Sequence, residues 1–502
     1  MKLLDAPSQA ARARRPCHDE LSRAPAGSNG VSAREFMHAG SDFSHTSSPA
    51  RSVAHPIRSR LWKLAIVVGS VLLVIVVAEI VGRIRHPSHQ IALGHDLLPS
   101  YAAGVLVREG HPRLMYDRNA VAAVERQTIA DADLAMDAKF CPWLNPPFYA
   151  WAFAPLSALP YRQAAALFLA INVILLAASL VLLTRMVGPR QSRIPIHSDF
   201  GDSEFGFSPR GQILASTVLI PLLIVLPLPF WQAMCHQQNT FISLLLLSGA
   251  VVFWRRGDGF RAGVLAGLLF FKPQLAAVFA MALIVGMGWR ALAGLAITGA
   301  ALLAITLFTM PGCLGDFLHR LPPILHWLQN ESPYNWGRQV TFQSFWRLLT
   351  QGQVRGETVF AAKLLWWASS AVVLAGLAVA ARRHIRQGPS SLSRDRLIAA
   401  AVVSMPLLMP YYMDYDLLLL AIPAVLLASE WVRTPQFITH TDYWLLAAWI
   451  AVGLESYFNP ALAGHTRLNL IVPLLATLSA LHIARCLRRQ LTPTTHRCPA
   501  NI

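Results

Sequence analysis

Long apolar runs alternate with short polar links along the chain from residue 64 onward. Many of these runs are long enough to cross the apolar part of a bilayer as one helix. The pattern therefore predicts an all-α polytopic membrane protein with about 12 membrane helices, within a range of about 11 to 13. The expected spans are residues 64–81, 163–187, 213–229, 241–254, 262–271, 275–288, 291–310, 359–381, 397–409, 417–431, 444–455 and 468–484.

One apolar stretch, NPPFYAWAFAPLSALPYR at residues 145–162, does not fit this pattern well. It is short for a span and carries prolines at both ends, where they interrupt a helix. We expect a helix that dips into the membrane and returns, over about residues 147–160. A thirteenth span is the alternative.

Composition supports the membrane class. Of 502 residues, 54% are hydrophobic and 14% are charged, a balance that ordinary soluble domains do not show. The net charge of +17 would suit nucleic acid, but Lys and Arg on the cytoplasmic edges of a membrane protein give the same surplus. We expect membrane lipids and no nucleic acid among the partners.

The six cysteines include no CxxC pair, so the sequence indicates no metal knuckle and no redox motif.

The chain is expected to divide into one membrane domain and two tails. Residues 1–58 are rich in Arg, Ser, Ala, Gly and Pro without apolar periodicity, which predicts a disordered cytoplasmic tail. Residues 59–490 form the membrane domain, and residues 491–502 form a second cytoplasmic tail. No small-residue cleavage site follows the first apolar run, so we expect a retained helix and no signal peptide.

Basic links set the expected orientation in a plasma (inner) membrane. Four basic residues between positions 51 and 63 precede the first span, and the links RRGDGFR, RRHIRQGPSSLSRDR and RCLRRQ are strongly basic. The positive-inside rule places these links and both termini in the cytoplasm. The polar stretches 94–117, 231–240, 311–344, 410–416 and 456–467, and also Lys272, then lie on the outer, periplasmic face.

The outer face is therefore where we expect chemistry. Nucleotides are scarce there, but a sugar on a polyprenyl phosphate arrives within the membrane. Its transfer needs a carboxylate that takes the proton of an acceptor hydroxyl, and cations that hold the leaving phosphate. Asp96 suits the first role, and Lys272, Arg338 and Arg113 suit the second.

Several blocks also resemble a known family. They read DLLPSYAAGVLVREGHPRLMYD, NPPFYAWAFAPLSALP, HQQNT, RAGVLAGLLFFKPQ and MPYYMDYDLLLLAIP, and they cover most of residues 90–425. Each block is short and degenerate, but their order is similar to that of glycosyltransferase family 87. That family belongs to the GT-C superfamily of integral membrane enzymes, and its members are polyprenyl-phosphate-mannose-dependent mannosyltransferases.

The resemblance implies a GT-C fold and a hexosyltransferase that inverts the sugar's configuration. It implies that Asp96 is the catalytic base and that no cofactor takes part beyond the polyprenyl-phospho-sugar, with any need for a divalent metal left open. The acceptor is a lipid or a glycan. Substrate-binding residues are expected at Tyr101, Arg113, Gln238, Asn239, Lys272, Gln274, Arg338, Tyr411, Tyr412, Asp414 and Asp416.

The sequence departs from the family pattern in two places. The usual Gly before Gln-x-Asn is replaced by His236 or Gln237, and the usual Ser-Pro-His before the YD pair reads Met409, Pro410 and Tyr411. These departures bear on the specificity for donor and acceptor more than on the type of reaction.

Other interpretations of these residues stay open. An aspartate beyond a span is often only part of a solvated loop, Lys272 can reach the interface with its long side chain, and Asp416 can cap a helix that begins at Leu417. His236 has no partner cluster in the sequence that would indicate a metal ligand. A transporter or flippase of a lipid-linked sugar is the main alternative function, although the sequence shows no internal repeat. A membrane scaffold would not need Asp96, Lys272 and Arg338.

Overall fold

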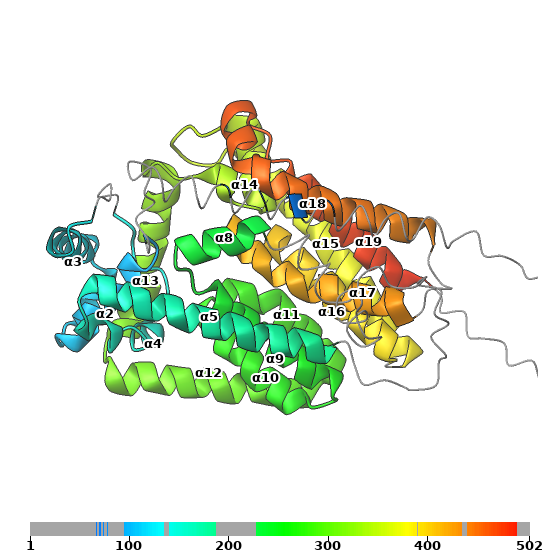
Figure 1. Ribbon diagram of the computed structural model, residues 1–502, viewed down its shortest axis with the longest axis horizontal. Coiled ribbons are helices and arrows are strands. Elements are labelled where there is room, and N and C mark those ends of the chain that lie inside the picture. The colour runs from blue at the N-terminus through cyan, green and yellow to red at the C-terminus, as the bar shows by residue number, and fades with distance from the viewer. Residues whose placement is uncertain are drawn as a thin grey trace, which may run out of the picture. The chain divides into compact units, whose positions relative to one another are not determined.

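The computed structural model describes residues 95–134, 140–186, 227–388, 390–433 and 439–488, with five isolated helical positions between residues 67 and 78. The described ranges are helical, and their only extended pairing is an isolated antiparallel bridge between Gln339 and Met413. The all-α class is confirmed (Figure 1). Both predicted tails and most of the predicted spans 64–81 and 213–229 lie outside the described residues.

The helices in chain order are α2 (Leu98–Arg108), α3 (Arg118–Asp131), α4 (Pro147–Ala150), α5 (Tyr161–Met186), α8 (Pro227–Cys235), α9 (Thr240–Arg255), α10 (Gly259–Leu268), α11 (Pro273–Met287), α12 (Trp289–Thr309), α13 (Cys313–His326), α14 (Phe342–Gln351), α15 (Phe360–Gln387), α16 (Ser391–Leu408), α17 (Ala421–Arg433), α18 (His440–Thr466) and α19 (Ile471–Leu487). Short helical turns lie at η2 (Pro112–Tyr116), η3 (Leu156–Ala158), η5 (Leu269–Phe271), η6 (Trp327–Glu331), η7 (Trp336–Arg338) and η8 (Asp414–Leu420). The predicted spans within the described residues coincide with helices. Four of the helices, α5, α12, α15 and α18, are long and apolar enough to cross a membrane, and a total near 12 stays a prediction.

Three apolar helices of the bundle are much shorter than these four. Helix α9 has 16 residues, α10 has 10 and α11 has 15, so at about 1.5 Å per residue each is about 15–24 Å long. The apolar part of a bilayer is about 30 Å thick. Each of these three helices is therefore shorter than the apolar part of a bilayer is thick, and Lys272 and Thr240 lie at ends of them.

Small residues allow α10 and α12 to pack closely. A Cβ atom at Gly263 would lie 2.2 Å from the backbone oxygen of Ala291, and one at Gly294 would lie 2.2 Å from that of Phe260. Glycines are used at such crossings because the helix backbones can then approach each other. The close packing of α10 against α12 fixes the orientation of α10, which Lys272 follows in the chain after the turn η5.

Several stretches that the sequence analysis treated as loops are helical, which corrects the predicted boundaries. Helices α2 and α3 lie in the stretch after Asp96, α13 lies in 311–344, and α18 continues to Thr466 through Pro460. The prolines and charged residues suggested loops, yet Asn459 donates to the carbonyl of Gly337 at 3.1 Å and anchors this part of α18. Tertiary contacts thus outweigh local sequence signals.

The stretch 145–162 does not form a spanning helix. Before α5 begins at Tyr161, it contains only the four-residue α4 and the three-residue η3, separated by turns. The hydroxyl of Tyr116 donates to the carbonyl of Asn145 at 2.7 Å, and the hydroxyl of Tyr101 donates to that of Leu159 at 2.8 Å. The prolines divide the stretch into short turns, so a thirteenth spanning helix is excluded here, and the dip into the membrane stays a prediction.

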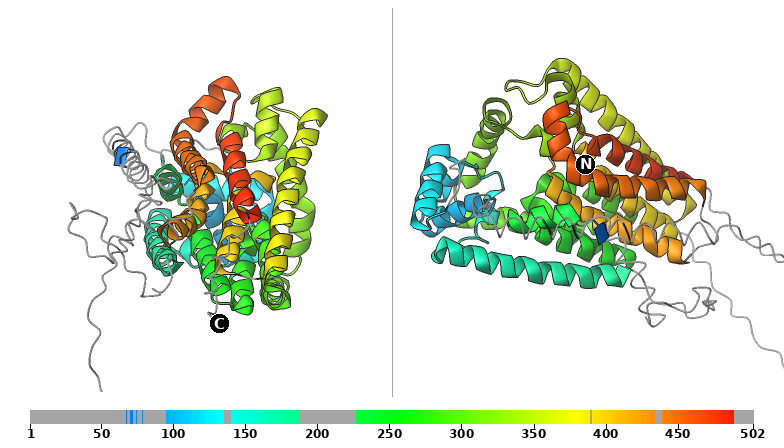
Figure 2. Two further views of the ribbon diagram at one scale, coloured as in Figure 1. Left: turned by 90° about the vertical axis from the view of Figure 1, so that its right-hand side faces the viewer. Right: turned by 45° about the horizontal axis from the view of Figure 1, so that its top comes forward.

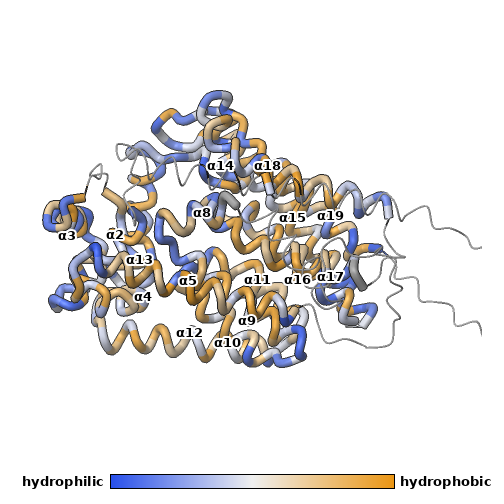
Figure 3. Tube along the Cα trace, in the orientation of Figure 1, coloured by the Kyte–Doolittle hydropathy of each residue, from blue (hydrophilic) through white to orange (hydrophobic). Residues whose placement is uncertain are grey.

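Basic links gather at one end of the helices. Arg255 pairs with Asp395 at 3.1 Å, and Arg396 and Arg485 share Glu430 at 2.6 and 2.8 Å. The network joins the ends of α9, α16, α17 and α19. In Figure 2, α15, α16 and α19 run alongside one another. Hydrophilic colour in Figure 3 collects at links such as the one between α9 and α10, whereas helices such as α9, α11 and α12 are mostly hydrophobic.

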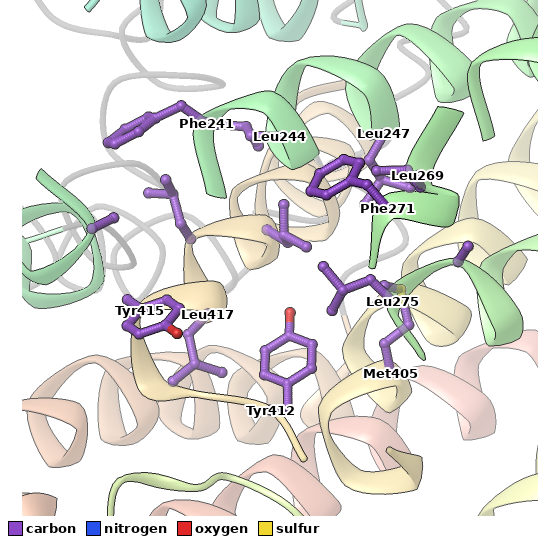
Figure 4. Close-up of a cluster of buried hydrophobic side chains, with 14 of the residues drawn as sticks. Phe241, Leu244, Leu247, Leu269, Phe271, Leu275, Met405, Tyr412, Tyr415 and Leu417 are labelled. Atoms are coloured by element: carbon purple, nitrogen blue, oxygen red, sulfur yellow. The ribbon is translucent and has the colours of Figure 1, made fainter. Parts of the chain in front are cut away.

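A large apolar core surrounds the short helices. Phe241, Leu247 and Leu275 from α9 and α11 pack with Met405 of α16 and Tyr412 of the following link (Figure 4). Their burial fixes the ends of three helices and the 410–416 stretch relative to one another.

The clustering of basic links gives a testable topology. We expect Cys substituted at His111 or Gly464 to react with an impermeant maleimide in intact cells, and Cys at Arg256 or Gln387 to react only after permeabilisation. All four positions are exposed, and the positive-inside rule puts the second pair in the cytoplasm. A background without the native cysteines is required. Labelling of the Gln387 position in intact cells would reverse the topology.

Candidate functional site

Asp96 lies in the turn before α2, where hydrogen bonds hold its carboxylate. Its backbone N–H donates to the carbonyl of His236 at 3.3 Å, and the side-chain amide of Gln238 donates to Oδ2. The Nδ1 atoms of His95 and His236 lie 3.2 Å from Oδ1 and 3.8 Å from Oδ2, and the Asp96 side chain is 23% exposed. Asp96 is therefore a positioned carboxylate that is still partly accessible.

The surroundings of Asp96 keep it ionised. Burial alone would raise the pKa of Asp96, but the hydrogen bond with His95 and the charges of His236, His95 and Arg338 outweigh burial and lower this pKa. The pKa of His236 is also lowered. Burial and the charges of Arg338 and His95 lower this pKa more than the charges of Asp96 and Asp414 raise it. At neutral pH the site therefore holds a carboxylate beside a neutral imidazole, which is the state that a general base needs.

Lys272 meets a carboxylate partner. Its Nζ lies 3.0 and 3.2 Å from the two carboxylate oxygens of Asp416, and the hydroxyl of Thr240 donates to Asp416 Oδ1 at 2.6 Å. The three residues are 7%, 4% and 0% exposed. The lysine therefore does not extend to the interface, and Asp416 pairs with it instead of capping the helix expected at Leu417, where the chain forms the 3-10 helix η8.

Arg338 and Asp414 form a second ion pair. Arg338 Nε and Nη2 donate to the two oxygens of Asp414 at 3.0 and 2.9 Å. This bidentate geometry fixes the plane of the guanidinium. Within the described part of the chain Nη1 has no hydrogen-bond partner, and the side chain is 19% exposed. Arg338 thus offers a donor edge close enough to Asp96 to lower its pKa.

Backbone and side-chain bonds hold the two ion pairs on one framework. Val340 N donates to the carbonyl of Tyr412 at 2.9 Å, and Tyr412 N donates to Gln339 Oε1 at 2.8 Å. The Tyr412 hydroxyl donates to the carbonyl of Asp416 at 2.8 Å. The stretches around Arg338 and Asp416 are therefore held side by side, although more than 70 residues separate them in the sequence.

Three consecutive residues connect the Asp96 turn to the Lys272 pair. Gln238 binds Asp96, Thr240 binds Asp416, and Asn239 lies between them. Consecutive Cα atoms are about 3.8 Å apart, so the anchor points of the two clusters are separated by less than about 8 Å. Asp96, Arg338 and Lys272 thus belong to one constellation.

Some of the other predicted site residues lie beside the Lys272 pair, and the rest have partners elsewhere. Gln274 donates to the hydroxyl of Tyr411 beside the Lys272 pair, and Tyr412 is fully buried as a framework residue. Tyr101 uses its hydroxyl on Leu159 and packs edge-on against Tyr161. Arg113 binds Asp316 at 2.7 Å and is 64% exposed. The structure thus gives Tyr101 and Arg113 partners other than the Asp96 constellation, and their substrate roles stay predictions.

The sequence analysis did not identify the close partners of Asp96 and Asp416. His95 adjoins Asp96 in sequence, whereas His236 and Thr240 flank the predicted Gln238 and Asn239. The polar stretch 231–240 between apolar runs was the available signal, and His236 was weighed there only as a metal ligand. No group of three or more His, Cys, Asp or Glu side chains that suits a metal ion occurs among the described residues.

Comparison with known proteins gives one match. A family model described as glycosyltransferase family 87 matches residues 143–410, which is more than half of the chain. The match contains His236, Gln238, Lys272 and Arg338, whereas Asp96 precedes it. No curated protein and no solved structure matches the chain.

Proposed function

The chain belongs to glycosyltransferase family 87, and from that membership in a family of membrane glycosyltransferases we propose a specific reaction. The enzyme moves a hexose, mannose in our proposal, from a polyprenyl-phospho-sugar to a hydroxyl of a lipid or glycan. The reaction takes place on the outer face of the inner membrane, with both termini in the cytoplasm. It inverts the configuration of the sugar.

The observation that carries this proposal is the ionised carboxylate of Asp96 beside Arg338. In the proposed reaction the acceptor oxygen attacks the anomeric carbon while the bond from that carbon to the phosphate oxygen breaks. The leaving polyprenyl phosphate keeps the bonding electron pair, and Asp96 takes the proton of the acceptor hydroxyl. One displacement gives inversion, and the carboxylate also stabilises the oxocarbenium-like centre.

Arg338 is the cation best placed for the leaving phosphate. Its Nε and Nη2 are fixed by Asp414, which leaves Nη1 as the donor that can bind a phosphate oxygen in this proposal. Arginine binds phosphate through planar, charge-assisted hydrogen bonds. Lys272 is paired more deeply with Asp416, so its role toward the phosphate is secondary in this proposal.

The Arg338→Lys variant tests the phosphate role. The substitution keeps the positive charge but removes the planar donor set, and hydrogen bonds to charged groups contribute about 1.5–3 kcal/mol. We expect the apparent KM for the donor to rise by about tenfold to a hundredfold. The matched change Arg320→Lys alters an exposed arginine that is also paired with aspartates, Asp117 and Asp316, and it should leave this KM within about twofold. Equal effects of both variants would contradict the assignment.

The function itself is tested with the purified full chain. Incubation with radiolabelled polyprenyl-phospho-mannose and a membrane lipid extract should move the label into a new lipid or glycan that chromatography separates from the donor. Proteoliposomes that carry the labelled donor across the bilayer without forming a new product would favour the flippase alternative. Transfer of glucose in preference to mannose would correct the sugar and keep the reaction type.

A further inference from the structure

His236, the second histidine beside Asp96, has a buried ring nitrogen without a hydrogen-bond partner among the described residues. His236 Nδ1 lies 3.8 Å from Asp96 Oδ2, which is beyond hydrogen-bond distance, and this buried atom has no hydrogen-bond partner in the described part of the chain. The bond from Asp96 N to the carbonyl of His236 holds the two residues together. Buried polar atoms in native proteins are usually paired, so this one indicates an interaction that forms during function.

The two imidazoles beside Asp96 differ in what they can do. An ionised carboxylate only accepts hydrogen bonds, so His95 Nδ1, at 3.2 Å from Oδ1, must donate its hydrogen. That nitrogen therefore has no lone pair available for a proton. His236 Nδ1 makes no such bond, and in the tautomer protonated on Nε2 it carries a lone pair 3.8 Å from Asp96 Oδ2.

We propose that His236 receives the proton that Asp96 takes from the acceptor and passes it to the aqueous outer face. This inference rests on the proposed function. When the O–H bond at Asp96 Oδ2 breaks, an N–H bond forms at His236 Nδ1, and the carboxylate is regenerated. The imidazolium then loses its other proton from Nε2 to water, and it returns to its first state by tautomerisation. His236 acts through Asp96 and is a positioning and proton-relay residue.

The charges around His236 support this direction of transfer. Before turnover its imidazole is neutral, because burial, Arg338 and His95 lower its pKa more than Asp96 in the α2 turn and Asp414 in η8 raise it. It can therefore accept a proton. A proton received from Asp96 restores the carboxylate, which then stabilises the imidazolium.

The pH dependence of kcat tests the relay. A protonated His236 cannot accept a proton, so the rate of the unaltered enzyme should fall as the pH drops below the pKa of His236, which lies under the ordinary value of about 6.5. His236→Gln should lower kcat at pH 7 by about tenfold, less than the loss expected for the base itself. In this variant the acid limb, the low-pH fall of the pH–rate profile, should move toward the lower pKa of Asp96. Added imidazole should restore part of the rate.

Two control variants isolate the effect. His95→Gln retains a donor toward Asp96 Oδ1, and His326→Gln changes an exposed histidine whose partners are Glu331 and Glu357. His326→Gln should keep the acid limb of the unaltered enzyme, whereas His95→Gln removes a group that lowers the pKa of His236 and should move the limb toward higher pH, opposite to the direction expected for His236→Gln. A His236→Gln variant with unchanged rate, or with a lower rate but an unchanged acid limb, overturns the relay. Failure of Asp96→Asn to lower the rate would instead overturn the proposed base.

Discussion

Asp96→Asn should abolish most of the sugar transfer while the protein still folds and binds the donor. The amide has nearly the size of the carboxylate and can still accept a hydrogen bond from Gln238, but it cannot take the proton of the acceptor hydroxyl. General-base catalysis contributes about a hundredfold to ten-thousandfold to a rate, which corresponds to about 3–5 kcal/mol of barrier. We therefore expect kcat to fall at least about a hundredfold with the apparent KM for the donor little changed.

Asp117→Asn is the matched control for this change. Asp117 caps helix α3, and its side chain accepts hydrogen bonds from the N–H groups of Asn119 and Ala120 at 3.0 Å. Asparagine caps helices about as well as aspartate, so this variant should keep nearly full activity. Near-normal turnover by Asp96→Asn would remove the general base from the mechanism and favour the transporter alternative.

The helices were predictable because apolar periodicity and length are strong signals in a membrane protein. The short helices α9, α10 and α11 were visible as short apolar runs, and their ends placed Lys272 correctly between two half-length helices. The continuation of α18 through Pro460 was not predictable, because the contact of Asn459 with Gly337 that anchors it joins residues far apart in sequence. Local signals describe elements, whereas such contacts decide where they end.

The candidate site was predictable in its residues and not in its pairings. Asp96, Lys272 and Arg338 each stood out as charged residues near apolar runs. That Asp414 binds Arg338 and Asp416 binds Lys272 was not predictable, because alternate residues of an irregular stretch can point in any direction. The structure thereby changes the role expected for Lys272 from a free cation to half of a buried ion pair.

Lys272→Met should destabilise the protein strongly. The substitution removes the partner of Asp416, whose side chain is 6% exposed. Among the described residues the buried carboxylate then keeps only the hydrogen bond from the Thr240 hydroxyl. Breaking a buried pair in this way costs about 3–5 kcal/mol. Thermal unfolding in detergent should show a clear decrease in Tm. Lys363→Met removes a lysine whose side chain is 41% exposed from a pair with Glu357, and it should change stability by less than about 1 kcal/mol.

The double variant Lys272→Met with Asp416→Asn separates stability from donor binding. A neutral asparagine no longer needs a cation and can still accept the hydrogen bond of Thr240, so much of the lost stability should return. If Lys272 also contacts the donor phosphate, the apparent KM for the donor stays raised in this stabilised variant. If the lysine serves only to neutralise Asp416, that KM returns toward the value of the unaltered enzyme. A single Lys272→Met variant as stable as the unaltered protein would contradict the buried pair, because it would mean that Asp416 does not depend on the lysine.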